Sequence, residues 1–157
     1  MNRREFTGLS LGSFALASMS VTGESQEPAG AKKDLHAKHA MQRDGFMKCA
    51  QACSSCQHEC DSCATHCANI LSEGKKEHMA TLMSCRDCAD FCTAAAQIVA
   101  RGGPFSALIC ESCAEACARC GQECEKFPDD EHMKRCAQEC RKCEKECREM
   151  AKHPGHK

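Results

Sequence analysis

The sequence predicts an all-α protein: an antiparallel up-down-up-down four-helix bundle with a core lined by cysteine. Two observations predict this fold class. The chain of 157 residues contains 18 cysteines, and they fall in four blocks at 49–67, 85–92, 110–124 and 136–147. Within every block the cysteines recur at alternating steps of three and four residues. That alternation keeps side chains on one face of an α-helix, whereas a β-strand requires steps of two.

Turn-forming residues separate the blocks and limit the expected helices. Gly74 ends the first connection, and the second, Gly102-Gly103-Pro104, combines helix-ending glycine with helix-starting proline. In the third, Asp129-Asp130 can cap the following helix. Because the connections are short, consecutive helices should be antiparallel neighbours. The helices are expected at residues 40–72, 75–101, 104–126 and 129–151.

The N-terminus resembles a twin-arginine export signal. Arg3-Arg4 precede a mildly apolar stretch at 9–17, and Ala15-Leu16-Ala17 offers a small-residue cleavage pattern. Residues 22–33, rich in Gly, Ser, Glu, Pro and Lys, are expected to form a linker. We therefore expect a signal peptide and linker at 1–30, a four-helix domain with the cysteine-lined core at 31–157, and a periplasmic location.

Charge and hydropathy exclude two classes of partner. The 22 acidic residues nearly cancel the 21 lysines and arginines, whereas binding to nucleic acid requires a basic surplus. No apolar run reaches the roughly 18 residues of a membrane-spanning helix. Neither a nucleic acid nor a membrane span is therefore expected.

Thiols on inward-facing helical stripes can form disulfides, bind divalent metals or bind Cu(I). Side chains three or four residues apart in a helix lie about 5–6 Å apart at Cβ, whereas a disulfide requires about 3.5–4.5 Å. Disulfides within a block would be strained, although bridges between helices remain possible. A Zn²⁺ ion on four unshared thiolates would leave two negative charges in a dry core, and no basic residue occupies a core position within the blocks.

Cu(I) suits such a core because it is soft, prefers thiolate sulfur and carries one positive charge. One ion per thiolate makes the interior neutral, so the capacity for Cu(I) could approach the number of thiols. Eight four-residue steps supply pairs that share no cysteine, and Cys85 and Cys110 are left to bridge from neighbouring helices. The pairs are Cys49 with Cys53, Cys56 with Cys60, Cys63 with Cys67, Cys88 with Cys92, Cys113 with Cys117, Cys120 with Cys124, Cys136 with Cys140, and Cys143 with Cys147.

These repeated Cys-x-x-x-Cys pairs make residues 40–151 resemble the bacterial copper storage proteins, a family of cysteine-rich four-helix bundles. Arg3-Arg4 make the exported members the most similar. The resemblance implies Cu(I) held inside the bundle mainly by thiolates, stored for delivery or sequestered for safety. The second block departs from the family pattern, because the inward-facing positions after Cys92 are Ala95 and Val99 and not cysteine. The end of the bundle that contains these two residues should therefore hold less metal.

The two ends of the bundle are expected to differ. Steps of three or four residues toward the N-terminus from Cys85 reach Thr81 and His78. The same steps from Cys136 reach Met133 and His132. Imidazole and thioether groups are weaker Cu(I) ligands that suit a relay. The candidate residues for metal access are therefore His78, His132 and Met133.

The opposite end is expected to be an apolar plug. An alternative access route there stays open, because His36, His39, Met41 and Met47 lie near it in the sequence. His66 is interpreted as a plain surface residue. The residues expected to form the plug are Phe46, Val99, Phe105 and Met150.

Metal storage or buffering, without enzymatic activity, is the leading functional hypothesis, because no catalytic base accompanies the inward cysteines. One alternative is a zinc- or cadmium-buffering protein that resembles metallothionein, and another is an exported structural domain closed by disulfides. The storage hypothesis allows a copper-donor or copper-acceptor protein and a homo-oligomer as partners.

Overall fold

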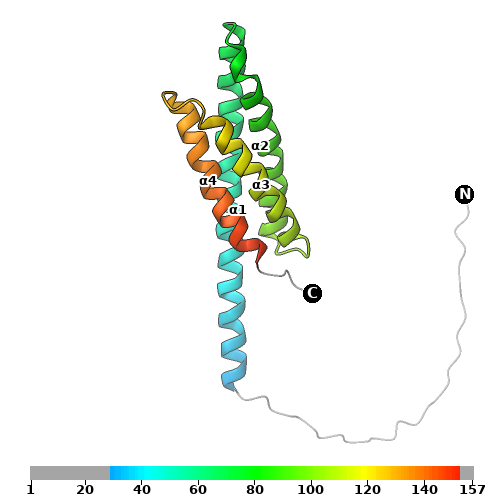
Figure 1. Cartoon of the computed structure of the whole chain (residues 1–157). Coiled ribbons are helices and arrows are strands. Elements are labelled where there is room, and N and C mark those ends of the chain that lie inside the picture. Colours follow the sequence, from blue (N-terminus) through cyan, green and yellow to red (C-terminus); the bar gives the residue numbers. More distant parts are fainter. Residues whose placement is uncertain (1–28, 153–157) are drawn as a thin grey trace, which may run out of the picture.

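The computed structural model describes residues 29–152 and shows four long helices packed as a bundle (Figure 1). No strand occurs between residues 29 and 152, so the all-α prediction is confirmed. None of the helices in that range is both long and apolar enough to cross a lipid bilayer. The elements are α1 (Ala29–Ser72), the 3₁₀ helix η1 (Lys76–His78), α2 (Met79–Ala100), α3 (Ser106–Cys124) and α4 (Glu131–Ala151).

Sulfur contacts give the direction of each helix. Cys49 of α1 lies near Cys147 of α4, and the later Cys60 lies near the earlier Cys136, so α1 and α4 are antiparallel. The contacts from α1 to α3 instead rise together along both helices, which are therefore parallel. Both α1 and α3 pack against α2 and α4. Cys85 of α2 lies near Cys124 of α3, and the later Cys92 lies near the earlier Cys113, so α2 and α3 are antiparallel and the bundle is up-down-up-down, as predicted.

Helix α1 begins earlier than expected. It starts at Ala29 instead of residue 40 and extends beyond the other helices at its N-terminal end (Figure 1). The expected linker at 22–33 is therefore wrong from residue 29 onward. Residues 31–44 contain no proline or glycine and several strong helix formers, which favour helix despite their polar composition. The expected signal segment lies outside the described residues, apart from its last two positions.

The turns use the expected chemistry. Gly74 and Gly102 have φ angles of 91° and 60°, in the left-handed region that glycine adopts without strain. Asp130 caps α4 by accepting hydrogen bonds from the backbone amides of His132 and Met133. The glycine turns end helices and the Asp130 cap begins α4, so each cysteine block stays within one continuous helix.

The apolar plug forms with three of its four expected members. Phe46, Val99 and Met150 are buried, and the Phe46 ring packs beside Gly102. Phe105 is 64% exposed, so its assignment to the plug is wrong. It precedes the first turn of α3, and the neighbouring Ser106 is buried instead, donating its hydroxyl to the Gly103 carbonyl.

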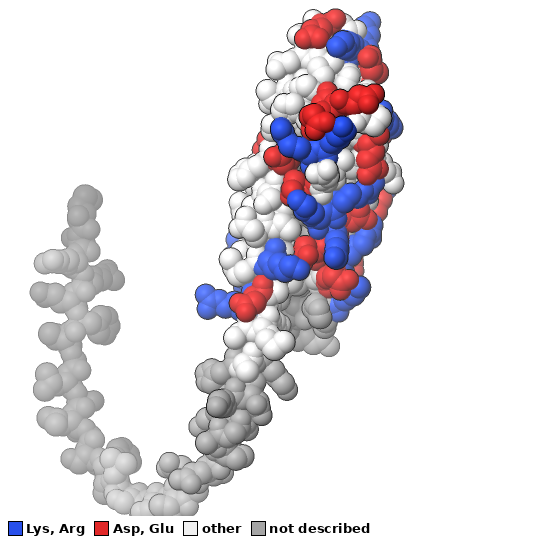
Figure 2. Space-filling view, turned by 90° about the vertical axis from the view of Figure 1, so that its left-hand side faces the viewer, with Lys and Arg blue, Asp and Glu red and all other residues white. Residues whose placement is uncertain are grey.

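Charged residues are unevenly distributed over the surface. Figure 2 shows Lys, Arg, Asp and Glu interspersed along one side of the bundle and a largely uncharged strip beside it. Helix α4 carries many of these charges, and Arg141 on it forms a bidentate ion pair with Glu125, just after α3. The Arg141 guanidinium lies over Gly121, where a Cβ atom would come within 3.2 Å of it. The ion pair fastens α4 to α3 outside the core.

We expect Gly102→Ala to lower the free energy of unfolding of the metal-free protein by about 1 kcal/mol, because alanine is strained at positive φ. Gly103→Ala is the matched control. Its added Cβ meets only ordinary contacts, and it should be neutral or stabilise by about 0.5 kcal/mol. Chemical denaturation of the reduced protein measures both. An equal loss in the two variants would contradict the assigned turn.

Candidate metal centre

Every cysteine side chain points into the bundle. All 18 are at most 1% exposed, and all are free thiols. The shortest distance between two sulfurs joined by a described contact is 3.5 Å, between Cys53 and Cys147, which is far longer than a covalent bond. The hypothesis of a domain closed by disulfides is therefore not supported.

The sulfurs form one connected network. Cys60 Sγ lies 3.9 Å from Cys56 Sγ on its own helix, but it lies 3.7 Å from Cys140 Sγ and 3.8 Å from Cys136 Sγ, both on α4. Most of the close sulfur contacts likewise join different helices, because the side chains converge on the bundle axis. A cysteine sulfur is therefore as close to sulfurs on adjacent helices as it is to the sulfur four residues away on its own helix.

Groups of four sulfurs recur along the axis. In each group the four Sγ atoms lie within 4.8 Å of one another. Five such groups are Cys53, Cys113, Cys143 and Cys147; Cys56, Cys92, Cys117 and Cys143; Cys56, Cys60, Cys88 and Cys140; Cys60, Cys120, Cys136 and Cys140; and Cys63, Cys85, Cys124 and Cys136.

Consecutive groups share cysteines. The shared residues, in order along the axis, are Cys143, then Cys56, then Cys60 with Cys140, and finally Cys136. The core is therefore a continuous column of sulfur, in which one thiolate can bridge two metal ions. Separate tetrahedral sites with four unshared ligands each would need more cysteines than these five groups contain.

The column has no built-in positive charge. Among the residues whose burial is described, the buried polar or charged ones are His78, Thr81 and Ser106, and no lysine or arginine is buried. Ionised thiols in this environment would be strongly destabilised unless bound cations neutralised them. The number of positive charges per sulfur decides which metals the core can accept.

Neighbouring thiols in the column differ in the direction in which their pKa is shifted. Hydrogen bonds from Cys117 and then Cys140 lower the pKa of Cys56. The pKa of its neighbour Cys60 is raised, mainly by its contact with Cys120 and also by burial. A thiolate is thus stabilised where adjacent thiols keep their protons. Without bound cations the column stays largely protonated, since charged neighbours would repel one another.

Sulfur is sparser at the plug end of α2. Ala95 and Val99 are fully buried at positions where the other helices continue with cysteine. The sulfurs at that end come from Cys49, Cys110 and Cys147, with Cys49 Sγ within 3.9 Å of both partners. Fewer sulfurs therefore lie at this end, where the sequence predicts less bound metal.

Two of the three expected access residues lie at the other end of the column. Met133 is fully buried, and its Sδ atom lies 3.5 Å from Cys63 Sγ. His78 is buried with its ring stacked on Phe127 at 4.1 Å, and its Nδ1 atom has no hydrogen-bond partner. The hydroxyl of the nearby core residue Thr81 is also unpartnered. Sulfur, imidazole and hydroxyl groups thus meet at this end.

The third expected access residue, His132, lies on the outside of the bundle. Its ring stacks on the His66 ring at 4.3 Å, and its Nδ1 atom pairs with Arg135. His66 in turn bonds Asp130 through Nε2 at 2.7 Å. Sequence reasoning missed this cluster and left His66 as a plain surface residue, because the partners lie 64 residues apart and follow no shared period.

The charge of Asp130 is maintained within this cluster. Burial alone would raise the pKa of Asp130, but hydrogen bonds from His66 and from the backbone amides of Met133 and His132 outweigh it, so the pKa is lowered. The carboxylate is therefore ionised at neutral pH, both as the cap of α4 and as the partner of His66.

The alternative route at the plug end has little structural support. Met41 and Met47 are exposed, away from the sulfurs, and Phe46 and Met150 close the core beside them. His39 is also exposed, beside the turn after α2, where it lines a surface pocket with Phe46 and Gly102. The side chain of His36 lies outside the described residues.

Comparison with known proteins gives a consistent result. The family described as copper storage protein matches residues 42–152. A cysteine-rich protein of Bacillus subtilis, YhjQ, is 38% identical over 104 residues, which cover 66% of this chain and 93% of that protein.

Solved structures are similar as well. A cytosolic copper storage protein from Streptomyces lividans, described with five coppers, is 30% identical with a TM-score of 0.67, covering 74% of this chain and 99% of its own. The Cu(I)-bound copper storage protein BsCsp3 is 38% identical with a TM-score of 0.59, covering 66% of this chain and 94% of its own.

The prediction of a periplasmic location is wrong by this comparison, because the similar Streptomyces protein is described as cytosolic. That prediction rested on Arg3-Arg4 and the apolar stretch after them, which lie outside the described residues. Paired arginines near an N-terminus are a weak signal when taken alone.

Proposed function

We propose that this chain, which belongs to the copper storage protein family, stores multiple Cu(I) ions on the cysteine thiolates of its bundle core. The observation that carries the proposal is the overlap of the four-sulfur groups into one column. A shared sulfur can bridge two ions, so many ions can bind within a narrow space. Storage requires no chemical step, and we assign the protein no enzymatic role.

Charge balance favours Cu(I) over divalent metals in this column. A monovalent ion for each thiolate gives a neutral interior, and thiolate sulfur is the ligand that Cu(I) prefers. One divalent ion for each thiolate would leave an excess of positive charge. Fewer divalent ions than thiolates would require separate sets of unshared ligands, which the overlapping groups do not supply. A zinc- or cadmium-buffering role is therefore the weaker candidate.

All 18 cysteines are the proposed ligands, since all are buried and free. The proposed storage domain is residues 31–157. We expect fewer ions near Ala95 and Val99, where α2 supplies no sulfur. The proposed ligand residues are Cys49, Cys53, Cys56, Cys60, Cys63, Cys67, Cys85, Cys88, Cys92, Cys110, Cys113, Cys117, Cys120, Cys124, Cys136, Cys140, Cys143 and Cys147.

We propose that Cu(I) reaches the column at the end where His78 and Met133 lie. Met133 is in contact with the thiol of Cys63, and the unpartnered Nδ1 of His78 is buried close by in the same end of the fold. These groups bind Cu(I) less strongly than thiolate, so they can pass an ion inward. The outward position of His132 gives it at most an accessory part in this route.

The storage proposal predicts the outcome of an anaerobic titration of the reduced protein with Cu(I) against a chelator of known affinity. Tight uptake should continue well beyond about four ions per chain, the upper range for separate tetrahedral sites with 18 thiols. Cys56→Ser should lower the capacity by at least about one ion, because this sulfur belongs to two groups.

Ser62→Ala, a change at an exposed position of the same helix, serves as the control and should leave the capacity unchanged. Saturation at about four ions, or displacement of bound Cu(I) by equimolar Zn²⁺, would contradict the proposal.

The access route is tested by the rate of Cu(I) loading. Met133→Leu keeps the volume but removes the thioether, and His78→Phe keeps a ring against Phe127 but removes the imidazole. Each should slow loading roughly three- to tenfold, because a relay ligand is lost. Met47→Leu at the opposite end is the matched control. Unchanged rates in both access variants would refute the route.

A further inference from the structure

The end of the column that holds Met133 is closed in this structure. Cys63, Cys67, Cys85 and Cys124 supply its last sulfurs, and each is at most 1% exposed. Sulfurs with so little accessible surface cannot bind an ion directly from solvent. Some part of the protein must therefore move before metal can enter or leave.

The connection between α3 and α4, residues 125–130, lies across this end. Phe127 on the connection stacks against His78, and Asp130 bonds His66. Both histidines belong to the other half of the bundle, at η1 and α1 respectively. The connection therefore reaches from its own pair of helices and fastens to the opposite pair at two points.

The position of Met133 depends on the same connection. The carboxylate of Asp130 accepts from the amides of His132 and Met133 through Oδ1 and bonds His66 through Oδ2. One side chain thus links the first turn of α4 to α1. The stacked rings of His66 and His132 strengthen that link, and Met133 is held over Cys63.

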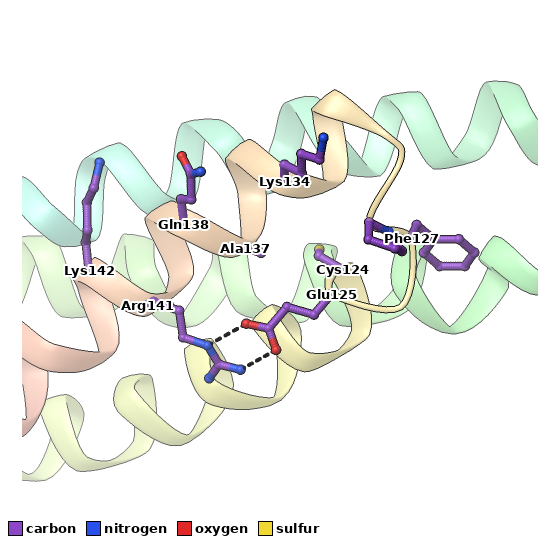
Figure 3. Close-up of a pocket in the computed structure, with 9 residues that line it drawn as sticks. Cys124, Glu125, Phe127, Lys134, Ala137, Gln138, Arg141 and Lys142 are labelled. Atoms are coloured by element: carbon purple, nitrogen blue, oxygen red, sulfur yellow. Dashed lines mark hydrogen bonds and ion pairs between the residues drawn. The ribbon is translucent and has the colours of Figure 1, made fainter.

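The connection has space to move on its other side. A pocket of 480 Å³ lies between the end of α3 and α4, lined among others by Cys124, Phe127, Lys134 and Ala137. Figure 3 shows Phe127 on the connection at one end of this pocket, and the pair of Glu125 with Arg141 across its side. Arg141 holds the base of the connection, whereas its tip is held by the contacts with His66 and His78.

We propose that residues 125–130 form a lid over the thiol column, and that the His66–Asp130 pair is the fastener that keeps it shut. His66 and Asp130 are then positioning residues that bind no metal themselves. The lid sets how fast Cu(I) enters and leaves without changing how tightly the sulfurs hold it. The consequence for Cu(I) rests on the proposed storage function, whereas the lid itself can be tested without metal.

The test uses Asp130→Ser in the full chain. Serine caps a helix about as well as aspartate, so α4 should still begin correctly, but its side chain is too short to bond His66. The reduced, metal-free protein is treated with a small alkylating reagent, and each cysteine is followed by peptide mass spectrometry. We expect alkylation to accelerate about three- to tenfold at one end only, the effect of losing one half-buried hydrogen bond to a charged group. The accelerated residues should be Cys63, Cys67, Cys85 and Cys124.

Two internal comparisons separate a lid from general weakening of the bundle. Cys49 and Cys110 at the plug end should keep their wild-type rates. Asp129→Ser removes the same charge from an exposed neighbour and should change no rate. Acceleration at both ends, or at neither end, would overturn the proposal.

A second variant approaches the pair from α1. His66→Ala leaves the cap of α4 intact and should reproduce the end-specific acceleration. The double variant with Asp130→Ser should be no faster than the faster single variant, because both remove the same contact. Additive effects would show that the two residues do not act as one fastener.

Copper kinetics complete the test. In Asp130→Ser, Cu(I) loading and chelator-driven removal should both accelerate by the same factor, with affinity and capacity unchanged. A loss of affinity or capacity would make the pair part of the metal site and overturn its role as a fastener. If the wild-type protein bound no Cu(I), the storage proposal would fail, while the alkylation pattern would still decide whether the lid exists.

Discussion

The neutralisation of buried thiolates is the constraint on which the rest of this structure depends. Four helices enclose 18 sulfurs with almost no exposed surface, and no buried lysine or arginine balances them among the residues whose burial is described. A charge in a buried core is tolerated only when an opposite charge lies close to it. A protonated column and a column filled with monovalent cations both meet that condition. The protein can therefore keep one fold while it binds or releases Cu(I).

The two ends of the bundle serve this constraint in different ways. At one end Phe46, Val99 and Met150 exclude water with apolar groups, and α2 supplies no sulfur there. At the other end the closure contains imidazole, thioether and the hydrogen bond between His66 and Asp130, which are groups that can bind a metal or separate at modest cost. This difference in chemistry supports the proposed passage of metal through the second end and closure of the first.

The sequence predicts most of the fold, because a single period determines it. Steps of three and four residues place every cysteine on an inward face, and Gly74, Gly102 and Asp130 mark the turns, so helix number, direction and core follow from local rules. The early start of α1 was missed because its first residues are polar, a composition that suits a linker and a solvated helix equally. The exposure of Phe105 was missed because a residue just outside a helix does not follow its period.

Pairing across the bundle was harder to predict. The pairs four residues apart could be read from the sequence, but the shared groups, such as the one that joins Cys56 to Cys92 and Cys117, depend on how far each helix is shifted along its neighbours. The contact of His66 with Asp130 has the same origin. Helix shift is set by the packing of all side chains together, which no local pattern encodes.

The number of protons released for each Cu(I) bound tests the central claim most directly. The thiols begin protonated, and each thiol that binds metal as a thiolate releases one proton. A pH-stat titration of the reduced protein, carried to full loading, should give about one proton per Cu(I), as a neutral column of shared sulfurs requires. A constant value of about two protons per Cu(I) would indicate unshared, negatively charged sites and would contradict the account.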